Sequence, residues 1–140
     1  MRIERATFES HHADIRHVRL AVFVDEQSVP LELELDDRDP LCVHLVAYDD
    51  SGAPVGTGRL DVDYGGKIGR VAVLGRARRR GVGTALMSRL HELAASAGLG
   101  SVWCNAQISA LAFYEELGYR SVGERFDEAG IEHVRMERGL

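Results

Sequence analysis

A short run of arginines and glycines near the middle of the chain constrains its fold most strongly. The run, Arg78-Arg79-Arg80-Gly81-Val82-Gly83, follows an apolar stretch, Ile68–Leu74, and opens a long amphipathic segment, Val82–Ala97. The first amides of a helix have no intrahelical acceptor, and the helix dipole adds partial positive charge at the same end. A strand, a glycine-rich turn and a helix in this order therefore predict a site for an anion such as phosphate.

Two other kinds of phosphate loop are excluded by the spacing of the residues. A P-loop needs a lysine directly after its second glycine, and the dinucleotide fingerprint needs a third glycine where Leu86 stands here. What remains is R-x-x-G-x-G followed by Thr84. Taken alone, these six residues could also form a basic turn at the start of a solvated helix. The choice between this interpretation and a phosphate site depends on the rest of the chain.

Composition places the chain among ordinary globular proteins. The 140 residues, 45% hydrophobic and 28% charged, predict one domain spanning residues 1–140. A net charge of −5 argues against general nucleic-acid binding. We expect no membrane span and no signal peptide, because no apolar run is long enough and the first residues are charged. Cys42 and Cys104 lie in apolar runs, which predicts reduced core thiols of a cytoplasmic protein rather than a disulfide or metal ligands.

The pattern of apolar residues predicts an α+β fold. Strands are expected at 1–8, 42–48, 54–62, 67–74, 101–106, 119–123 and 133–137, helices at 12–23, 81–97 and 109–117, and a long acidic loop with a single helical turn at 24–40. This order predicts three layers, with helices on both faces of a mixed, mostly antiparallel central sheet. The strands at 67–74 and 101–106 are joined by a helix and should be parallel neighbours.

A second motif lies downstream of the glycine loop. The segment from Gln107 to Tyr119 resembles the acetyltransferase pattern N-x-x-A-x-x-x-Y-x-x-x-G-[FY], with Gln107 in place of the usual Asn and with Ala110 and Tyr114 in register. The two motifs in this order resemble the GNAT superfamily of N-acetyltransferases. The stretches 22–30, 36–37, 44–47 and 130–136 resemble its ElaA-like or YjcF-like subgroup. The resemblance covers nearly the whole chain.

The resemblance implies the acyl-CoA N-acyltransferase (GNAT) fold and transfer of an acetyl group from acetyl-CoA to a primary amine of a small molecule or peptide, without a metal. The loop amides should bind the pyrophosphate, and a kinked strand at 71–73 should pair with the pantetheine arm. Arg76, Arg79 and Arg80 remain alternatives for the ribose phosphate. The expected cofactor-binding residues are Val71, Ala72, Val73, Arg78, Arg79, Arg80, Gly81, Val82, Gly83, Thr84, Gln107 and Tyr114.

The catalytic residues follow from the same resemblance. Tyr114 should protonate the leaving thiolate. Many relatives place a glutamate on the strand before the glycine loop, but this chain has Gly69 there, so the base is open. Glu26, His44 and His133 are the alternatives, together with a base that acts through water. An interpretation from another functional class is a coenzyme A binding or sensing module without turnover, which Gly69 favours and Tyr114 opposes.

The acidic segment offers a guide to the acceptor. Seven carboxylates lie between residues 25 and 39, opposed within the segment only by Arg38. We expect this segment, with His44, to line the acceptor side and to favour a cationic or amine-bearing substrate. A nucleic-acid or membrane partner is not expected, and a homodimer is compatible with the sequence.

Overall fold

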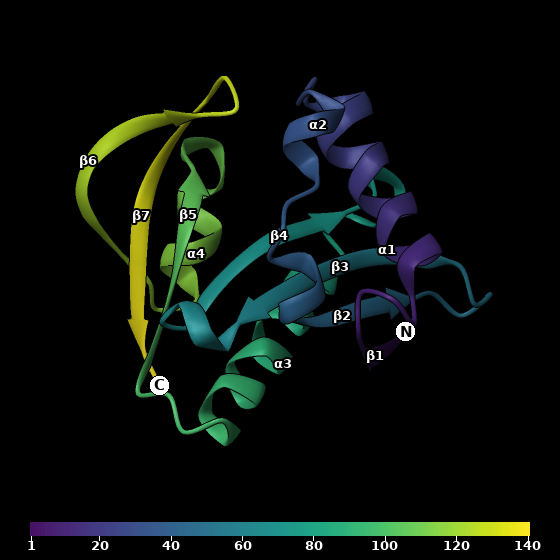
Figure 1. Ribbon diagram of the computed structural model, residues 1–140, viewed down its shortest axis with the longest axis horizontal. Helices are drawn as coiled ribbons and strands as arrows, with labels where there is room; N and C mark the ends of the chain where they lie inside the picture. Colours follow the sequence, from purple (N-terminus) through teal and green to yellow (C-terminus); the bar gives the residue numbers. More distant parts are fainter.

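The computed structural model describes all 140 residues as one seven-stranded mixed sheet with helices on both faces (Figure 1). The strands, in the order β1-β2-β3-β4-β5-β7-β6 across the sheet, pair antiparallel except for β4 and β5. Their bounds are β1 (Arg2–Ala6), β2 (Val43–Tyr48), β3 (Pro54–Asp61), β4 (Lys67–Val73), β5 (Ser101–Gln107), β6 (Arg120–Glu128) and β7 (Ile131–Gly139). The helices are α1 (His12–Arg19), α2 (Leu31–Glu34), α3 (Val82–Ser96) and α4 (Leu111–Glu116). The predicted α+β class and the parallel pairing are confirmed.

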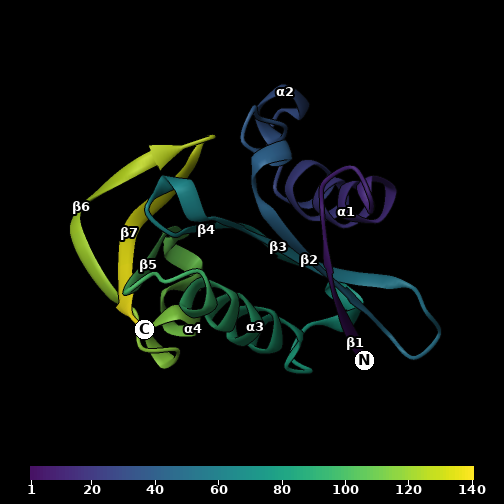
Figure 2. The same ribbon diagram turned by 60° about the horizontal axis from the view of Figure 1, so that its bottom comes forward.

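Two helix layers cover the sheet from opposite sides (Figure 2). On one side α1 buries Ile15 against β2 and Val18 against Ala72 of β4. On the other side α3 buries residues spaced at three and four positions, including Leu86 and Leu90, in the main core. Because both faces of β2, β3 and the second half of β4 are covered, ligands can reach the sheet only where the helices leave it open.

The parallel pair β4 and β5 diverges almost at once. Lys67 and Trp103 form the only residue pair of their ladder, and beyond it the two strands separate (Figure 1). A bulge in β4 contributes to the separation, because Arg70 and Val71 together oppose the single residue Gly58 of β3. Arg70 has a φ of 52° at this bulge. The kink expected at 71–73 is present as this bulge, which begins slightly earlier on the strand.

The acidic segment differs from its prediction. The first helix does not end at residue 23 but continues as a π-helical turn, Leu20–Glu26, in which the amide of Gln27 bonds the carbonyl of Val22 at 3.1 Å. Helix α2 and a 3-10 turn, Asp39–Leu41, follow. The predicted long loop with one helical turn is therefore wrong in detail. A π-helical turn, with hydrogen bonds between residues five apart, does not repeat every 3.6 residues. The apolar residues of this segment therefore do not show the period by which a helix is predicted from sequence.

Other predicted features are closer to the structure. β6 and β7 form one long hairpin that extends past both predicted strands, with a turn at Ala129 and Gly130. Cys42 and Cys104 are buried and form no disulfide. None of the helices combines the length and the apolar character that crossing a membrane requires.

Candidate active site

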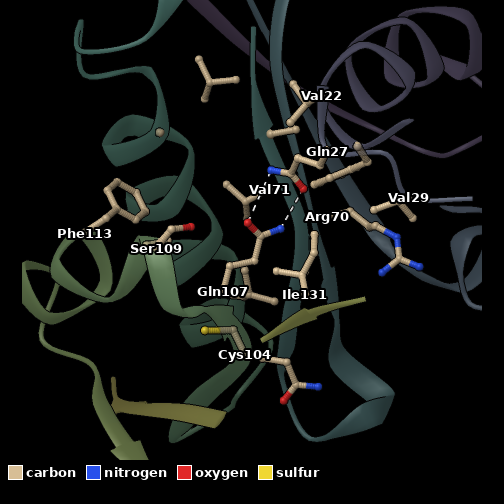
Figure 3. A pocket seen from close by; sticks show the side chains of 18 of the residues that line it. Val22, Gln27, Val29, Arg70, Val71, Cys104, Gln107, Ser109, Phe113 and Ile131 are labelled. Carbon is tan, nitrogen blue, oxygen red and sulfur yellow. Dashed lines mark hydrogen bonds between the residues drawn. The ribbon is translucent and has the colours of Figure 1, made fainter. Parts of the chain in front are cut away.

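The divergence of β4 and β5 opens a cavity of about 1060 Å³ (Figure 3). Its walls come from both strands, the turn after α1, the loop before α3, and parts of α4 and β7. The volume is slightly above the usual range for small-molecule sites in proteins, which is about 300–1,000 Å³. Of the expected cofactor-binding residues, only Arg80 does not border it.

The glycine loop presents backbone amides to this cavity. Gly81, with a φ of 80°, precedes α3 and provides no side chain to cap it. The first backbone bond of the helix runs from the Ala85 amide to the Gly81 carbonyl, so the amides of Val82, Gly83 and Thr84 precede the intrahelical bonds. All three residues line the cavity. Gly83 has a second role, because a Cβ there would lie 3.3 Å from the Phe113 ring.

Tyr114 and Gln107 approach the cavity from the side of β5. The neighbouring Tyr119 hydroxyl is hydrogen-bonded to Nε2 of His91 at 2.6 Å, whereas the Tyr114 hydroxyl has no partner within the protein. Burial raises the pKa of Tyr114, with a smaller contribution from Cys104, so the hydroxyl stays protonated at neutral pH. Gln107 forms a reciprocal amide pair with Gln27 across the cavity, at 2.8 and 3.4 Å (Figure 3).

Comparisons with known proteins agree with this geometry. The family model described as "Acetyltransferase (GNAT) domain" matches residues 12–140. The chain belongs to the GNAT acetyltransferase family. It is 42% identical over 130 residues to the uncharacterized N-acetyltransferase YjcF of Bacillus subtilis (strain 168), covering 91% of this chain and 92% of that protein.

Two solved structures extend the comparison. An acyl-CoA N-acyltransferase from Pseudomonas aeruginosa is 30% identical with a TM-score of 0.85, and the alignment covers 99% of each chain. Escherichia coli ElaA is 26% identical with a TM-score of 0.87, again over 99% of each chain. These findings confirm the predicted resemblance, the GNAT fold and the assignment as an acyltransferase. GNAT proteins use acetyl-CoA as acyl donor.

Two of the three predicted candidates for the base are poorly placed in this GNAT domain. His44 does not border the cavity. It is buried on β2 with Nε2 donating to the Asp39 carbonyl at 2.8 Å, and burial lowers its pKa. Glu26 borders the cavity, but both of its carboxylate oxygens accept hydrogen bonds from Arg78 at 2.6 Å. These bonds lower the pKa of Glu26 and weaken it as a base. The geometry therefore favours neither His44 nor Glu26 as the base.

His133 of β7 is the remaining candidate side chain. Its Nδ1 lies 2.7 Å from the Ile131 carbonyl, and because a carbonyl only accepts, Nδ1 carries the hydrogen. Nε2 of the neutral ring is then the basic nitrogen, 3.6 Å from Oε2 of Glu128. Both His133 and Glu128 line the cavity. No sequence pattern favoured His133 over Glu26 and His44 as the base.

Much of the negative charge of the acidic segment is paired within the protein. Arginines from α1, β3 and β4 meet its carboxylates: Arg19 binds Glu34 and Asp39, Arg59 binds Asp36 and Asp39, and Arg70 binds Asp36. Burial alone would raise the pKa values of Asp36 and Asp39, but hydrogen bonds from Arg59 and Arg19 hold both below their usual range. The carboxylates of this segment that line the cavity, Glu26, Glu34 and Asp36, are all paired with arginines, which weakens the basis for expecting a cationic acceptor there.

Proposed function

We propose that this protein transfers an acetyl group from acetyl-CoA directly to a primary amine. One observation carries the proposal: a single cavity brings together uncapped helix amides, an unpaired strand edge and an unbonded tyrosine hydroxyl. The first suits a pyrophosphate, the second an extended amide-containing chain, and the third a leaving group that acquires negative charge.

The cofactor fits the residues present. The amides of residues 81–84 would bind the pyrophosphate, helped by Arg78. The β4 edge at Val71, Ala72 and Val73, which lacks a β5 partner, would hydrogen-bond the pantetheine amides as a neighbouring strand does. Gln107 would contact the same arm. Arg79 is our choice for the ribose phosphate, because it borders the cavity, whereas Arg80 does not and Arg76 is paired with Asp49 at 3.1 Å.

Acetyl transfer needs one group that donates a proton to the leaving sulfur and another that accepts a proton from the amine. Acetyl-CoA supplies a thioester whose carbonyl carbon is attacked by the amine nitrogen, with loss of the carbon–sulfur bond. Tyr114 would donate its hydroxyl proton toward the departing sulfur. Nε2 of His133 would take the proton from the amine, directly or through a water, and Glu128 would stabilise the resulting imidazolium. A backbone amide at the β4 bulge would polarise the thioester carbonyl.

The second candidate function is a coenzyme A binding or sensing module. Gly69 favours it, because no carboxylate stands at that position of β4 and nothing lies within 4 Å of the place where a side chain would begin. The two buried, unpaired thiols support a reducing compartment such as the cytoplasm for either function.

Release of free coenzyme A thiol in the presence of a panel of amines tests the proposal, with mass spectrometry to identify the acetylated product. Calorimetry with coenzyme A runs in parallel. Transfer to any amine supports the proposed function. Binding of coenzyme A without transfer to any amine favours the sensing module, and absence of binding contradicts both.

A further inference from the structure

Lys67 is the only lysine of the chain, among 17 lysine and arginine residues. It is the first residue of β4 and lines the cavity at the point where β4 and β5 begin to separate. Its ammonium group lies over aromatic faces, 5.1 Å from the ring centre of Trp103 and 5.9 Å from that of Tyr64. No carboxylate lies within the 4 Å of an ion pair, so the positive charge has no anionic partner in the protein.

The carboxylates closest to this region are already engaged. Asp61, which is opposite Lys67 on β3, accepts two hydrogen bonds from Arg38 at 2.7 and 2.8 Å. Asp36 is held by Arg59 and Arg70. Since these pairs neutralise each other, the charge that remains in this part of the cavity is that of Lys67.

A smaller cavity of about 190 Å³ adjoins the main one at Lys67. It shares Asp36, Arg59 and Lys67 with the main cavity. Its walls carry three cationic and two anionic side chains, which leaves one net positive charge. Its volume is below the range for whole drug-sized ligands and suits a small charged group of a larger molecule.

Space for such a molecule lies next to Lys67. Gly69 is two residues further along β4, roughly 6–7 Å away at the rise of a strand, and side chains two apart face the same side. A Cβ at Gly69 would have no atom within 4 Å. The missing side chain therefore leaves room between Lys67 and the bulge at Arg70.

We propose that the acceptor is an amine that also carries an anionic group, and that Lys67 binds this group. The inference rests on the proposed acetyl transfer and narrows its substrate class. An acceptor held at Lys67 by its carboxylate or phosphate would extend along the open surface at Gly69 toward the thioester. The unpaired charge of Lys67 therefore favours an anion-bearing amine, in contrast to the cationic acceptor that the acidic segment suggested.

The test uses pairs of acceptors that differ only in charge. An ω-amino carboxylate is compared with its carboxamide, and an aminoalkyl phosphate with the corresponding amino alcohol, at low and high salt. We expect kcat/KM to be about tenfold or more higher for the anionic member, mainly through a lower KM, with the difference reduced by salt. The carboxylate and phosphate arms show which anion is preferred.

Substitution of the lysine completes the test. Lys67→Met keeps an unbranched apolar stem over Trp103 and should abolish the preference for the anionic acceptor without changing affinity for coenzyme A. Lys67→Arg should retain the preference. Arg89→Gln removes one exposed cation on α3, outside the cavity lining, and serves as the charge-matched control.

The possible outcomes distinguish a failure of the role proposed for Lys67 from a failure of the proposed acetyl transfer. Transfer to amines without a preference for the anionic member, or with a preference that survives in Lys67→Met, overturns the role of Lys67 and leaves the proposed function standing. Absence of transfer to every amine overturns the proposed function and this inference together.

Discussion

Arg78 in the glycine loop is joined to Glu26, 52 positions earlier, by two hydrogen bonds of 2.6 Å. The same guanidinium donates from Nε to the Val73 carbonyl at 3.0 Å. The turn after α1 is thus tied to the end of β4 at the place where we expect phosphate. The Glu26 carboxylate thus already binds Arg78, the side chain that we expect to bind the pyrophosphate.

Glu26→Gln should therefore tighten coenzyme A binding. Removal of the negative charge frees Arg78 and reduces repulsion of the phosphates, by about threefold or more at low salt and less at high salt. Calorimetry at two salt concentrations measures the effect. Asp25→Asn is the matched control, since Asp25 is exposed and outside the cavity lining. A loss of turnover that depends on pH would instead identify Glu26 as the base.

The role of the loop backbone can be tested at Gly81. Asparagine and aspartate tolerate positive φ better than other side chains, and no atom lies within 4 Å of a Cβ at this position. Gly81→Asp and Gly81→Asn have nearly the same shape and differ in charge. We expect the aspartate variant to bind coenzyme A about tenfold or more weakly than the asparagine variant, roughly 1.4 kcal/mol. Equal affinities would place the phosphates elsewhere. Gly83 is less suitable, because its substitution also disturbs the contact with Phe113.

Tyr114→Phe should reduce turnover about a hundredfold or more while coenzyme A affinity changes little. The ring stays and keeps its edge contacts with Phe113 and Tyr119, whose ring centres lie 5.1 and 5.5 Å away. Single-turnover measurements separate chemistry from product release. A loss of less than about threefold in the chemical step would show that the sulfur leaves without help from this hydroxyl.

The buried ion pairs predict acid sensitivity. The pKa values of Asp36 and Asp39 are lower in the folded protein than in the unfolded chain, where the pKa of an aspartate is about 3.9. Their contribution to stability is therefore complete above that pH and is lost as the pH falls toward the folded-state values. Urea unfolding between about pH 6 and pH 3 should show this loss.

The variant Asp39→Asn tests the same network at neutral pH. It leaves Arg19 and Arg59 buried with fewer partners, and should destabilise the protein by roughly 3–5 kcal/mol with a weaker pH dependence. Asp63→Asn, at an exposed position without an ion pair, should change neither quantity. A flat stability profile in the unsubstituted protein would show that the paired carboxylates do not govern acid unfolding.

The parts of the site that sequence could predict are local. Residue spacings within a single short segment were enough in each case to predict the glycine loop, α3 and the position of Tyr114. The partners of the acidic segment could not be predicted in this way, because Arg19, Arg59 and Arg70 come from three other elements. His44 shows a related limit. Both faces of β2 are covered, so alternation along the strand carries no information about which face a histidine occupies.

The separation of β4 and β5 also places two unpaired strand edges in the interior of a sheet instead of at its border. Free edges at a border recruit strands of other molecules and promote aggregation, and proteins usually protect them with charges or bulges. Here the two edges face each other across one cavity. The fold thus keeps backbone hydrogen-bonding groups available to a thin, flexible ligand inside the sheet, away from the border where strands of other proteins pair.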